Sequence, residues 1–381
     1  VRSRGLGDVY KRQVVLFAGM FVVGAALFHT GLAQKIGIGI VKISGTKESS
    51  LMFGIMVVSA ALSSCLSNTG TAACLMPVVL GICAAAKIPA SRQLMPLAYA
   101  AGIGGVITMV GTPPNIIVSG VLTSFGYESF SFFEFAWIGI PLTFVVIAYM
   151  MFIGKYLLPK AELDANQEIE QEIEATVTDS KKQIVSGLIL AVCIIVMALD
   201  LKAISLEMTA IIGALVCVLT GCLTEKQAYS AIDWVTIFLF AGMMPVSAAM
   251  DKTGAGKLIA EWAVSLMGGD PTPIIMTSVL FIISCTLTQF MSNTAACALL
   301  APVGVAISQQ LGASPKAVLM AIGVAASCAF ATPVGTPPCT LVLGPGGYKF
   351  MDYVKVGVPL VVLCFIVSII VIPMVWPFFP G

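Results

Sequence analysis

Five short motifs occur twice in this chain, in the same order and about 220 residues apart. The pairs are FAGM at 17–20 and 240–243, TG at 30–31 and 253–254, SNT at 67–69 and 292–294, GTPP at 111–114 and 335–338, and IGIPL at 138–142 with VGVPL at 356–360. Repetition in a fixed order at a nearly constant offset is typical of a duplicated structural unit. The chain is therefore predicted to fold as two copies of one unit.

Both copies are rich in long apolar runs, such as 184–199 and 354–375. The chain is 58% hydrophobic and only 10% charged, whereas soluble domains carry about 25% charged residues. A helix needs about 20 apolar residues to cross a bilayer core of about 30 Å, and its backbone is then hydrogen-bonded internally. We therefore predict an all-α polytopic membrane protein in a lipid bilayer. The net charge of +1 gives no indication of a nucleic-acid partner.

Each copy is expected to contain a span, a hairpin with SNT at its bend, a long helix broken at GTPP and a final span. The expected ranges are 14–36, 51–64 (leading hairpin arm), 94–124 and 136–158, and then 235–259, 274–289 (leading arm), 315–345 and 354–376. The hairpin arms are expected to be short, because helices of about 14 to 16 residues reach only ~21–24 Å. We therefore predict re-entrant hairpins. With two further spans at 184–200 and 205–222, the chain holds about eight spans and two hairpins.

An odd number of predicted spans separates the two FAGM motifs, so the second copy is expected to be inverted relative to the first. Inverted repeats are typical of secondary transporters, which bind substrate near the bilayer midplane. Most Lys and Arg residues fall on the side of the first hairpin's mouth. The positive-inside rule then places that mouth in the cytoplasm and the C-terminus outside.

The chain divides into four expected regions. Residues 1–13 are polar and basic, unlike the apolar run that begins at Val14, and are interpreted as a non-native leader. Residues 14–158 form the first repeat, which lacks counterparts of the spans at 184–222 and is expected to be truncated at its start. Residues 159–183 are predicted to form a cytoplasmic linker helix, and 184–381 the second repeat.

The SNT motifs put polar side chains where polar groups are costly in a membrane. Ser, Asn and Thr at a helix end can simply cap the helix. Two such bends brought together by inverted symmetry favour a ligand site instead. The side-chain oxygens and exposed carbonyls there suit a hard cation such as Na⁺, and the Asn and Thr donors suit an anion.

The GTPP motifs predict helix breaks. A residue before proline is driven out of the α region, so Thr112 and Thr336 should be non-helical, while proline is well tolerated at the first position of the helix after the break. Such a break offers carbonyl oxygens to a cation and a helix N-terminus to an anion. A simple kink is the alternative, and the duplication of the motif argues against it.

None of the 19 Asp and Glu residues lies in the middle of a predicted span. Proton-driven carriers usually need a buried titratable relay, so the sequence favours Na⁺ held by neutral oxygens, with no other cofactor. An ion antiporter or arsenite-type carrier on a similar scaffold is the alternative of another class, and it should show carboxylates near its breaks. The sequence offers no nucleophile–base set for an enzyme, and the cysteines are interpreted as small apolar residues.

The paired SNT hairpins and GTPP breaks resemble those of the divalent anion:sodium symporter family, over about 14–381. The resemblance implies a homodimer, an elevator-like motion, and transport of di- or tricarboxylates or sulfate. It implies one sodium site at Ser63, Ser67, Asn68 and Gly111, and a second at Thr288, Asn293 and Gly335. It also implies substrate contacts from Asn68, Thr69, Thr112, Pro113, Asn293, Thr294, Thr336 and Pro337.

Two departures bear on the substrate. Cys339 stands where the first copy has Asn115, and the stretch 344–348 is more similar to sulfate-type relatives. The expected function is sodium-coupled import of a small divalent anion across the cell inner (plasma) membrane. C4-dicarboxylates such as succinate or malate are the leading expectation, and sulfate or another oxyanion is the alternative.

Overall fold

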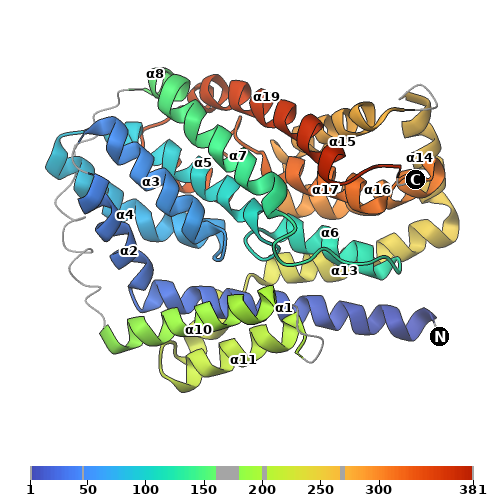
Figure 1. Ribbon diagram of the computed structural model, residues 1–381, viewed down its shortest axis with the longest axis horizontal. Helices are drawn as coiled ribbons and strands as arrows, with labels where there is room; N and C mark the ends of the chain where they lie inside the picture. The colour runs from blue at the N-terminus through green and yellow to red at the C-terminus, as the bar shows by residue number, and fades with distance from the viewer. Residues whose placement is uncertain (1, 45–46, 160–179, 200–203, 267–270, 380–381) are drawn as a thin grey trace.

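A computed structural model of the protein describes residues 2–44, 47–159, 180–199, 204–266 and 271–379, and every regular element in these ranges is helical (Figure 1). The predicted all-α fold is therefore confirmed for these ranges. The predicted linker helix at 159–183 falls mostly outside the described residues.

The helices of the first copy follow the expected order. They are α1 (Arg2–His29), α2 (Leu32–Ser44), α3 (Glu48–Ser63), α4 (Asn68–Ala86), α5 (Leu94–Gly104), α6 (Pro113–Ser124), α7 (Ala136–Tyr149) and α8 (Lys155–Leu157), with short helices at Ala90–Arg92, Gly105–Ile107 and Met150–Gly154. Between α5 and α6 the chain leaves the α-helix, so the break predicted in 94–124 is present.

The second copy repeats this order after two additional helices. The helices are α10 (Ser180–Ala198), α11 (Leu206–Leu219), α12 (Glu225–Ala231), α13 (Trp234–Thr253), α14 (Ala255–Leu266), α15 (Pro273–Thr288), α16 (Asn293–Leu311), α17 (Pro315–Ser327), α18 (Pro337–Leu343) and α19 (Phe350–Val375). Here the break predicted in 315–345 separates α17 from α18.

Five described helices are long and apolar enough to cross a membrane, or six if the bent pair α1–α2 counts as one span. Two of the five are the trailing hairpin arms α4 and α16, of 19 residues each. The prediction that both arms of each hairpin are short is therefore wrong for the trailing arms. It holds for the leading arms α3 and α15, which have 16 residues each.

The TG motifs mark a bend that the sequence analysis missed. The expected span 14–36 is broken between α1 and α2, whose axes differ by 59°. Gly31 adopts a φ of 75°, a left-handed conformation that ends helices because glycine has no Cβ to clash. Gly254 has the same φ of 75° between α13 and α14, so the expected span 235–259 also contains a helix break.

The bend yields a test of stability. Gly31→Ala places a Cβ in the left-handed region, which costs about 1–2 kcal/mol. Gly39→Ala is the matched control, because Gly39 lies within α2 and a Cβ there meets nothing within 4 Å. We expect Gly31→Ala to lower the thermal unfolding midpoint of the purified protein, and Gly39→Ala to leave it unchanged or raise it slightly. Equal midpoints for the two variants would contradict this account of the bend.

The helices form two layers (Figure 1). Helices α1, α10 and α11 lie together along the lower edge of the view, and the hairpins and broken helices form a larger body above them. Within that body, α3, α4, α5 and α7 lie to the left, and α14 to α17 lie to the right.

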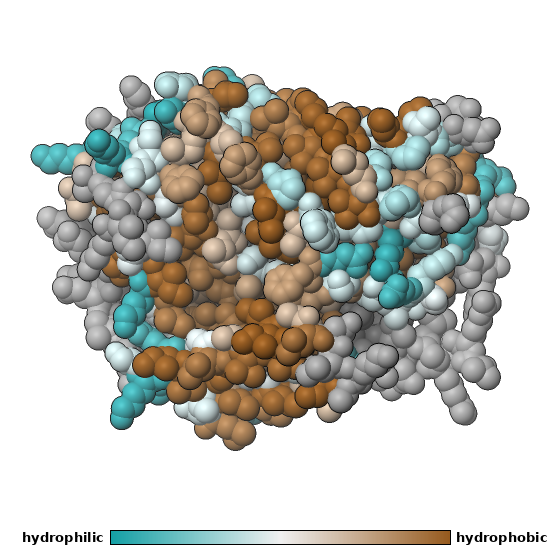
Figure 2. Space-filling view, viewed as in Figure 1, coloured by the Kyte–Doolittle hydropathy of each residue, from teal (hydrophilic) through white to brown (hydrophobic). Residues whose placement is uncertain are grey.

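Apolar side chains gather on the outer helices of both layers. Figure 2 shows hydrophobic surface over α19 and α7 at the top and over α10 and α11 at the bottom. On α10, the exposed Ile184, Leu188 and Val192 recur every fourth residue, which places them on one face of the helix. A continuous apolar outer surface is what contact with lipid requires. The chain is a multi-pass membrane protein.

Candidate functional site

The two SNT motifs lie at the bends between the hairpin arms. Ser67 is the N-cap of α4, and its hydroxyl accepts a hydrogen bond from Gly70 N at 3.1 Å. Ser292 caps α16 in the same way, accepting from Ala295 N at 3.2 Å. The capping role considered from the sequence is therefore real, but it occupies only the serines. Asn68 and Asn293 are the first residues of α4 and α16, so their side-chain amides do not act as the helix caps.

The two GTPP motifs have the conformation that their prolines require. Thr112 has φ −141° and ψ 142°, and Thr336 has φ −132° and ψ 142°. Both threonines are thus extended, as predicted, and a proline begins each following helix. The segment from Thr108 to Thr112 therefore leaves carbonyl groups without helical partners.

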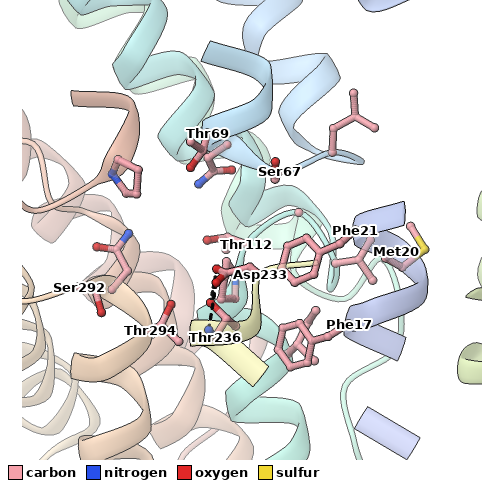
Figure 3. A pocket seen from close by; sticks show the side chains of 18 of the residues that line it. Phe17, Met20, Phe21, Ser67, Thr69, Thr112, Asp233, Thr236, Ser292 and Thr294 are labelled. Atoms are coloured by element: carbon pink, nitrogen blue, oxygen red, sulfur yellow. Dashed lines mark hydrogen bonds between the residues drawn. The ribbon is translucent and has the colours of Figure 1, made fainter. Parts of the chain in front are cut away.

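The hairpin tips and the breaks meet around one cavity of about 260 Å³. All eight residues that were expected to contact substrate line it: Asn68, Thr69, Thr112, Pro113, Asn293, Thr294, Thr336 and Pro337. The remaining wall of the cavity is formed by Phe17, Met20 and Phe21 of α1 and by the start of α13 (Figure 3). The cavity therefore lies between the two layers of the fold and draws on both repeats.

In the first repeat, oxygen atoms converge beside this cavity. The Ser63 hydroxyl lies 2.7 Å from Asn68 Oδ1 and 2.6 Å from Ala101 O. The opposite orientation of the Asn68 amide, with its nitrogen inward, satisfies more partners, because Nδ2 then donates to the Ser63 hydroxyl at 2.7 Å and to backbone carbonyls. Gly105 leaves room beside the cluster, because a Cβ on it would clash with Asn68 Oδ1 and would lie 2.9 Å from Gly111 O.

The second repeat builds the same cluster from its own residues. The Thr288 hydroxyl lies 2.7 Å from Asn293 Oδ1 and 2.8 Å from Ala326 O. Here too the amide satisfies more partners with its nitrogen inward, where Asn293 Nδ2 donates to the Thr288 hydroxyl at 2.7 Å. The two clusters arise from different residue types, Ser63 and Thr288, yet reach the same geometry.

Each asparagine has two orientations that suit two situations. With its nitrogen turned inward, Asn68 Nδ2 donates to Gly111 O at 3.1 Å and Ala101 O at 3.2 Å, and Asn293 Nδ2 donates to Gly335 O at 2.9 Å and Ala326 O at 3.2 Å. If a cation entered, the amide could turn its oxygen inward, so that a hydroxyl, an amide oxygen and two carbonyl oxygens would surround the ion. Unwound carbonyls of this kind bind Na⁺ in secondary transporters. The residues present therefore fit a hard monovalent cation.

Of the predicted sodium residues, Ser63, Asn68 and Gly111 meet in the first cluster, and Thr288, Asn293 and Gly335 in the second. Ser67 does not contribute its hydroxyl, which caps α4. Ala101 and Ala326 were missed, because a backbone carbonyl carries no signal in the residue type.

The cavity also carries groups that suit an anion. The N-termini of α4, α6 and α16 lie at its wall, and helix N-termini attract negative charge. Thr112 is buried, and its hydroxyl has no hydrogen-bond partner. A buried hydroxyl without a partner costs about 1–3 kcal/mol, and a bound carboxylate would satisfy it.

The role of the Thr112 hydroxyl can be tested without changing the volume of the side chain. Thr112→Val keeps the shape and removes the unpartnered group, so we expect thermal stability to be unchanged or higher. If the hydroxyl contacts substrate, the apparent KM for the transported anion should rise about tenfold, which corresponds to one hydrogen bond to a charged group. Uptake measured over a range of substrate concentrations, at saturating Na⁺, decides this. An unchanged KM would remove Thr112 from the site.

Other residues hold the breaks in place and were not found from the sequence. Thr108 and Thr332 donate their hydroxyls to Ser64 O and Gln289 O, which fastens each break to its hairpin. The two threonines share the repeat offset, so a comparison of single residues would have identified them. Asn115 is buried and donates to Thr108 O at 2.8 Å.

The two departures noted in the sequence lie away from the cavity. Neither Asn115 nor Cys339 lines it. Tyr348, at the end of the stretch 344–348, donates to Ser91 O and accepts from Met95 N. Asn115 and Tyr348 thus fasten backbone segments to each other.

Comparisons with known proteins give a consistent result. A family model, CitMHS, described as citrate transporter, matches residues 9–202 and 192–379. An uncharacterized transporter of Haemophilus influenzae is 32% identical over 93% of this chain and 79% of that protein. The sodium-dependent dicarboxylate transporter SdcS of Staphylococcus aureus (strain USA300) is 26% identical over 97% of this chain and 77% of that protein.

Two solved structures share the fold. The crystal structure of the Alcanivorax borkumensis YdaH transporter superposes with a TM-score of 0.65 at 16% identity, covering 96% of this chain and 86% of that chain. Neisseria gonorrhoeae MtrF, whose class is described as antimetabolite efflux pumps, gives a TM-score of 0.63 at 16% identity, over 97% of this chain and 84% of that chain. At such identities the likeness extends to the fold alone.

Proposed function

Because this chain belongs to the CitMHS citrate transporter family, we propose that it is a sodium-coupled symporter that imports small divalent anions, with C4-dicarboxylates such as succinate and malate as its substrates. Membership among membrane transporters of the citrate and dicarboxylate type agrees with the resemblance seen in the doubled motifs. The chain is a transporter and not an enzyme.

The observation that carries the proposal is the paired oxygen cluster beside one shared cavity. Asn68 and Asn293 each lie in an oxygen cluster and also line the cavity. A cation that fixed the amide oxygen inward would leave the amide nitrogen pointing away from the cluster. At Asn68 one hydrogen of that nitrogen donates to Gly102 O at 3.3 Å, and the other would be available to an anion in the cavity. Binding of Na⁺ would thereby complete the anion site, which is a direct physical basis for symport.

The cavity supports a small dicarboxylate as the cargo. Its volume of about 260 Å³ is below the ~300–1,000 Å³ of sites for drug-sized ligands. Its polar groups lie on opposite sides, with Thr69 on one hairpin tip and Thr294 on the other (Figure 3). A dicarboxylate can present one carboxylate to each repeat, and two bound Na⁺ ions would balance its two charges.

The movement and setting of the protein are part of the same proposal. The cavity lies between the two layers, so sliding of the hairpin layer along α1 and α13 would carry substrate across the membrane, as an elevator does. We propose that the chain works as a homodimer in the plasma membrane, with inverted repeats and its C-terminus outside. The placement of the C-terminus outside follows from the distribution of Lys and Arg in the sequence.

Uptake by proteoliposomes tests the function. Labelled succinate should accumulate with an inward Na⁺ gradient and should not accumulate when K⁺ replaces Na⁺. The initial rate should rise with Na⁺ concentration with a Hill coefficient above 1, since two clusters are present. Uptake that is equal without Na⁺ would overturn the coupling, and a proton gradient that replaces Na⁺ would favour the antiporter-type alternative. Inhibition by sulfate but not by unlabelled malate would move the assignment to an oxyanion.

A further inference from the structure

The cavity that we propose for an anion contains an acidic side chain. Asp233 lines it, together with Val235 and Thr236 from the start of α13, and it is the only charged residue among the described residues of the lining. Figure 3 shows Asp233 beside Thr112 and Thr236. Asp233 directly precedes α13, in keeping with the absence of Asp and Glu from the middle of the predicted spans, but this end of the helix lies at the cavity.

The carboxylate of Asp233 is held in place by its own helix. Asp233 Oδ1 accepts from Thr236 N at 3.1 Å, and Asp233 Oδ2 accepts from Thr236 Oγ1 at 2.5 Å. This is the geometry of a helix N-cap. The residue is nevertheless exposed to the cavity, so its negative charge acts on whatever the cavity binds.

Capping does not require the charge. The other long helices that begin at the cavity are capped or preceded by the neutral residues Ser67, Thr112 and Ser292. Ser and Asn cap helices about as well as Asp does. The positive N-terminal ends of α4, α6 and α16 carry no negative side chain and can interact with a bound anion. At α13 the carboxylate of Asp233 itself provides the negative charge.

We propose that Asp233 is a specificity-determining residue that limits the charge of the substrate, so that dianions are accepted and trianions are disfavoured. This inference rests on the proposed function, because it assumes that the cavity binds carboxylates. No cationic side chain among the described lining residues offsets Asp233, and Cys65 is the only other titratable group there. Two sodium charges balance a dianion, while the third charge of a trianion faces Asp233 across the cavity.

The size of the effect follows from Coulomb's law. At an effective dielectric of about 20, unit charges even ~10 Å apart repel each other enough to change affinity by at least about tenfold per unit charge. Neutralising Asp233 should therefore improve trianion binding about tenfold more than dianion binding.

The experiment compares two competitors of labelled succinate uptake, in proteoliposomes with saturating Na⁺. Unlabelled succinate is the dianion and propane-1,2,3-tricarboxylate the trianion, both fully ionised at about pH 8. The quantity measured is the ratio of their inhibition constants. Asp233→Asn and Asp233→Ser remove the charge and keep a capping group, and we expect both to shift the ratio about tenfold toward the trianion. Asp233→Glu should keep the original ratio. Thr236→Val removes the hydroxyl that donates to Asp233 Oδ2 but keeps the carboxylate charge, so it should also keep the original ratio of inhibition constants.

Each other result has a definite meaning. An unchanged ratio in both neutral variants, with succinate uptake retained, would overturn the inference and leave the proposed function standing. Loss of succinate binding in both neutral variants, but not in Asp233→Glu, would show that the carboxylate is needed for binding and would also overturn it. If the unmodified protein binds neither carboxylate, the proposed function and the inference both fail.

Discussion

Alanine at Asn68 or at Asn293 is expected to reduce sodium-dependent succinate uptake at least about hundredfold. Each asparagine faces its oxygen cluster and also lines the shared cavity, so either substitution removes a cation ligand and an anion donor together. An interaction with a charged group contributes about 1.5–3 kcal/mol, or roughly tenfold to hundredfold in affinity. Two such losses at one residue should bring transport close to background.

The hydroxyls of the clusters separate the two roles. Ser63→Ala and Thr288→Ala each remove one oxygen from a cluster, and neither residue lines the cavity. We expect the Na⁺ concentration for half-maximal uptake to rise about tenfold in each, while the succinate KM at saturating Na⁺ changes much less. Gln309→Ala is the control, because it removes an exposed side-chain amide whose only described contact is Tyr127 OH at 3.3 Å. If the asparagine variants keep their Na⁺ dependence, the clusters do not bind Na⁺.

The core of the candidate site could be predicted from the sequence because its residues are repeated and their chemistry is local. A threonine before proline is extended wherever it occurs, and Thr112 and Thr336 obey that rule. The duplication of the motifs was sufficient to predict that they meet at one site, and all eight predicted contact residues line one cavity.

Other parts of the site depend on tertiary placement, which the sequence does not display. Asp233 is unremarkable as a helix cap, and only the packing of α13 against α1 and α6 brings it to the cavity. Ala101 and Ala326 contribute only their backbone carbonyls to the clusters, so their residue type does not indicate that they belong to the site. The bends at Gly31 and Gly254 were visible as a repeated TG motif, but glycine in an apolar run is also compatible with an unbroken helix.

A single methyl group at Gly111 is expected to abolish sodium-dependent uptake. In Gly111→Ala, the new Cβ would lie 2.5 Å from Gly105 O and 2.9 Å from Ser63 O. Both are backbone atoms that cannot rotate away, so the break itself must shift. Gly111 O of the first cluster lies on that break, and the Ser63 hydroxyl lies at the end of α3. A shift of about 1 Å is enough to spoil such a site.

Gly102→Ala is the matched control for this prediction. Gly102 lies in α5, a few residues before the break, and its added Cβ would meet only Phe330 Cε1, at an ordinary distance of 3.6 Å. We expect this variant to keep the uptake rate and the Na⁺ dependence of the original protein. Thermal unfolding of both purified variants separates local distortion from general loss of structure, since overpacking costs about 1–3 kcal/mol. If Gly111→Ala folds and keeps its original Na⁺ dependence, the first cluster is not a coupling site, and sodium must act through the second cluster at Thr288 and Asn293 alone.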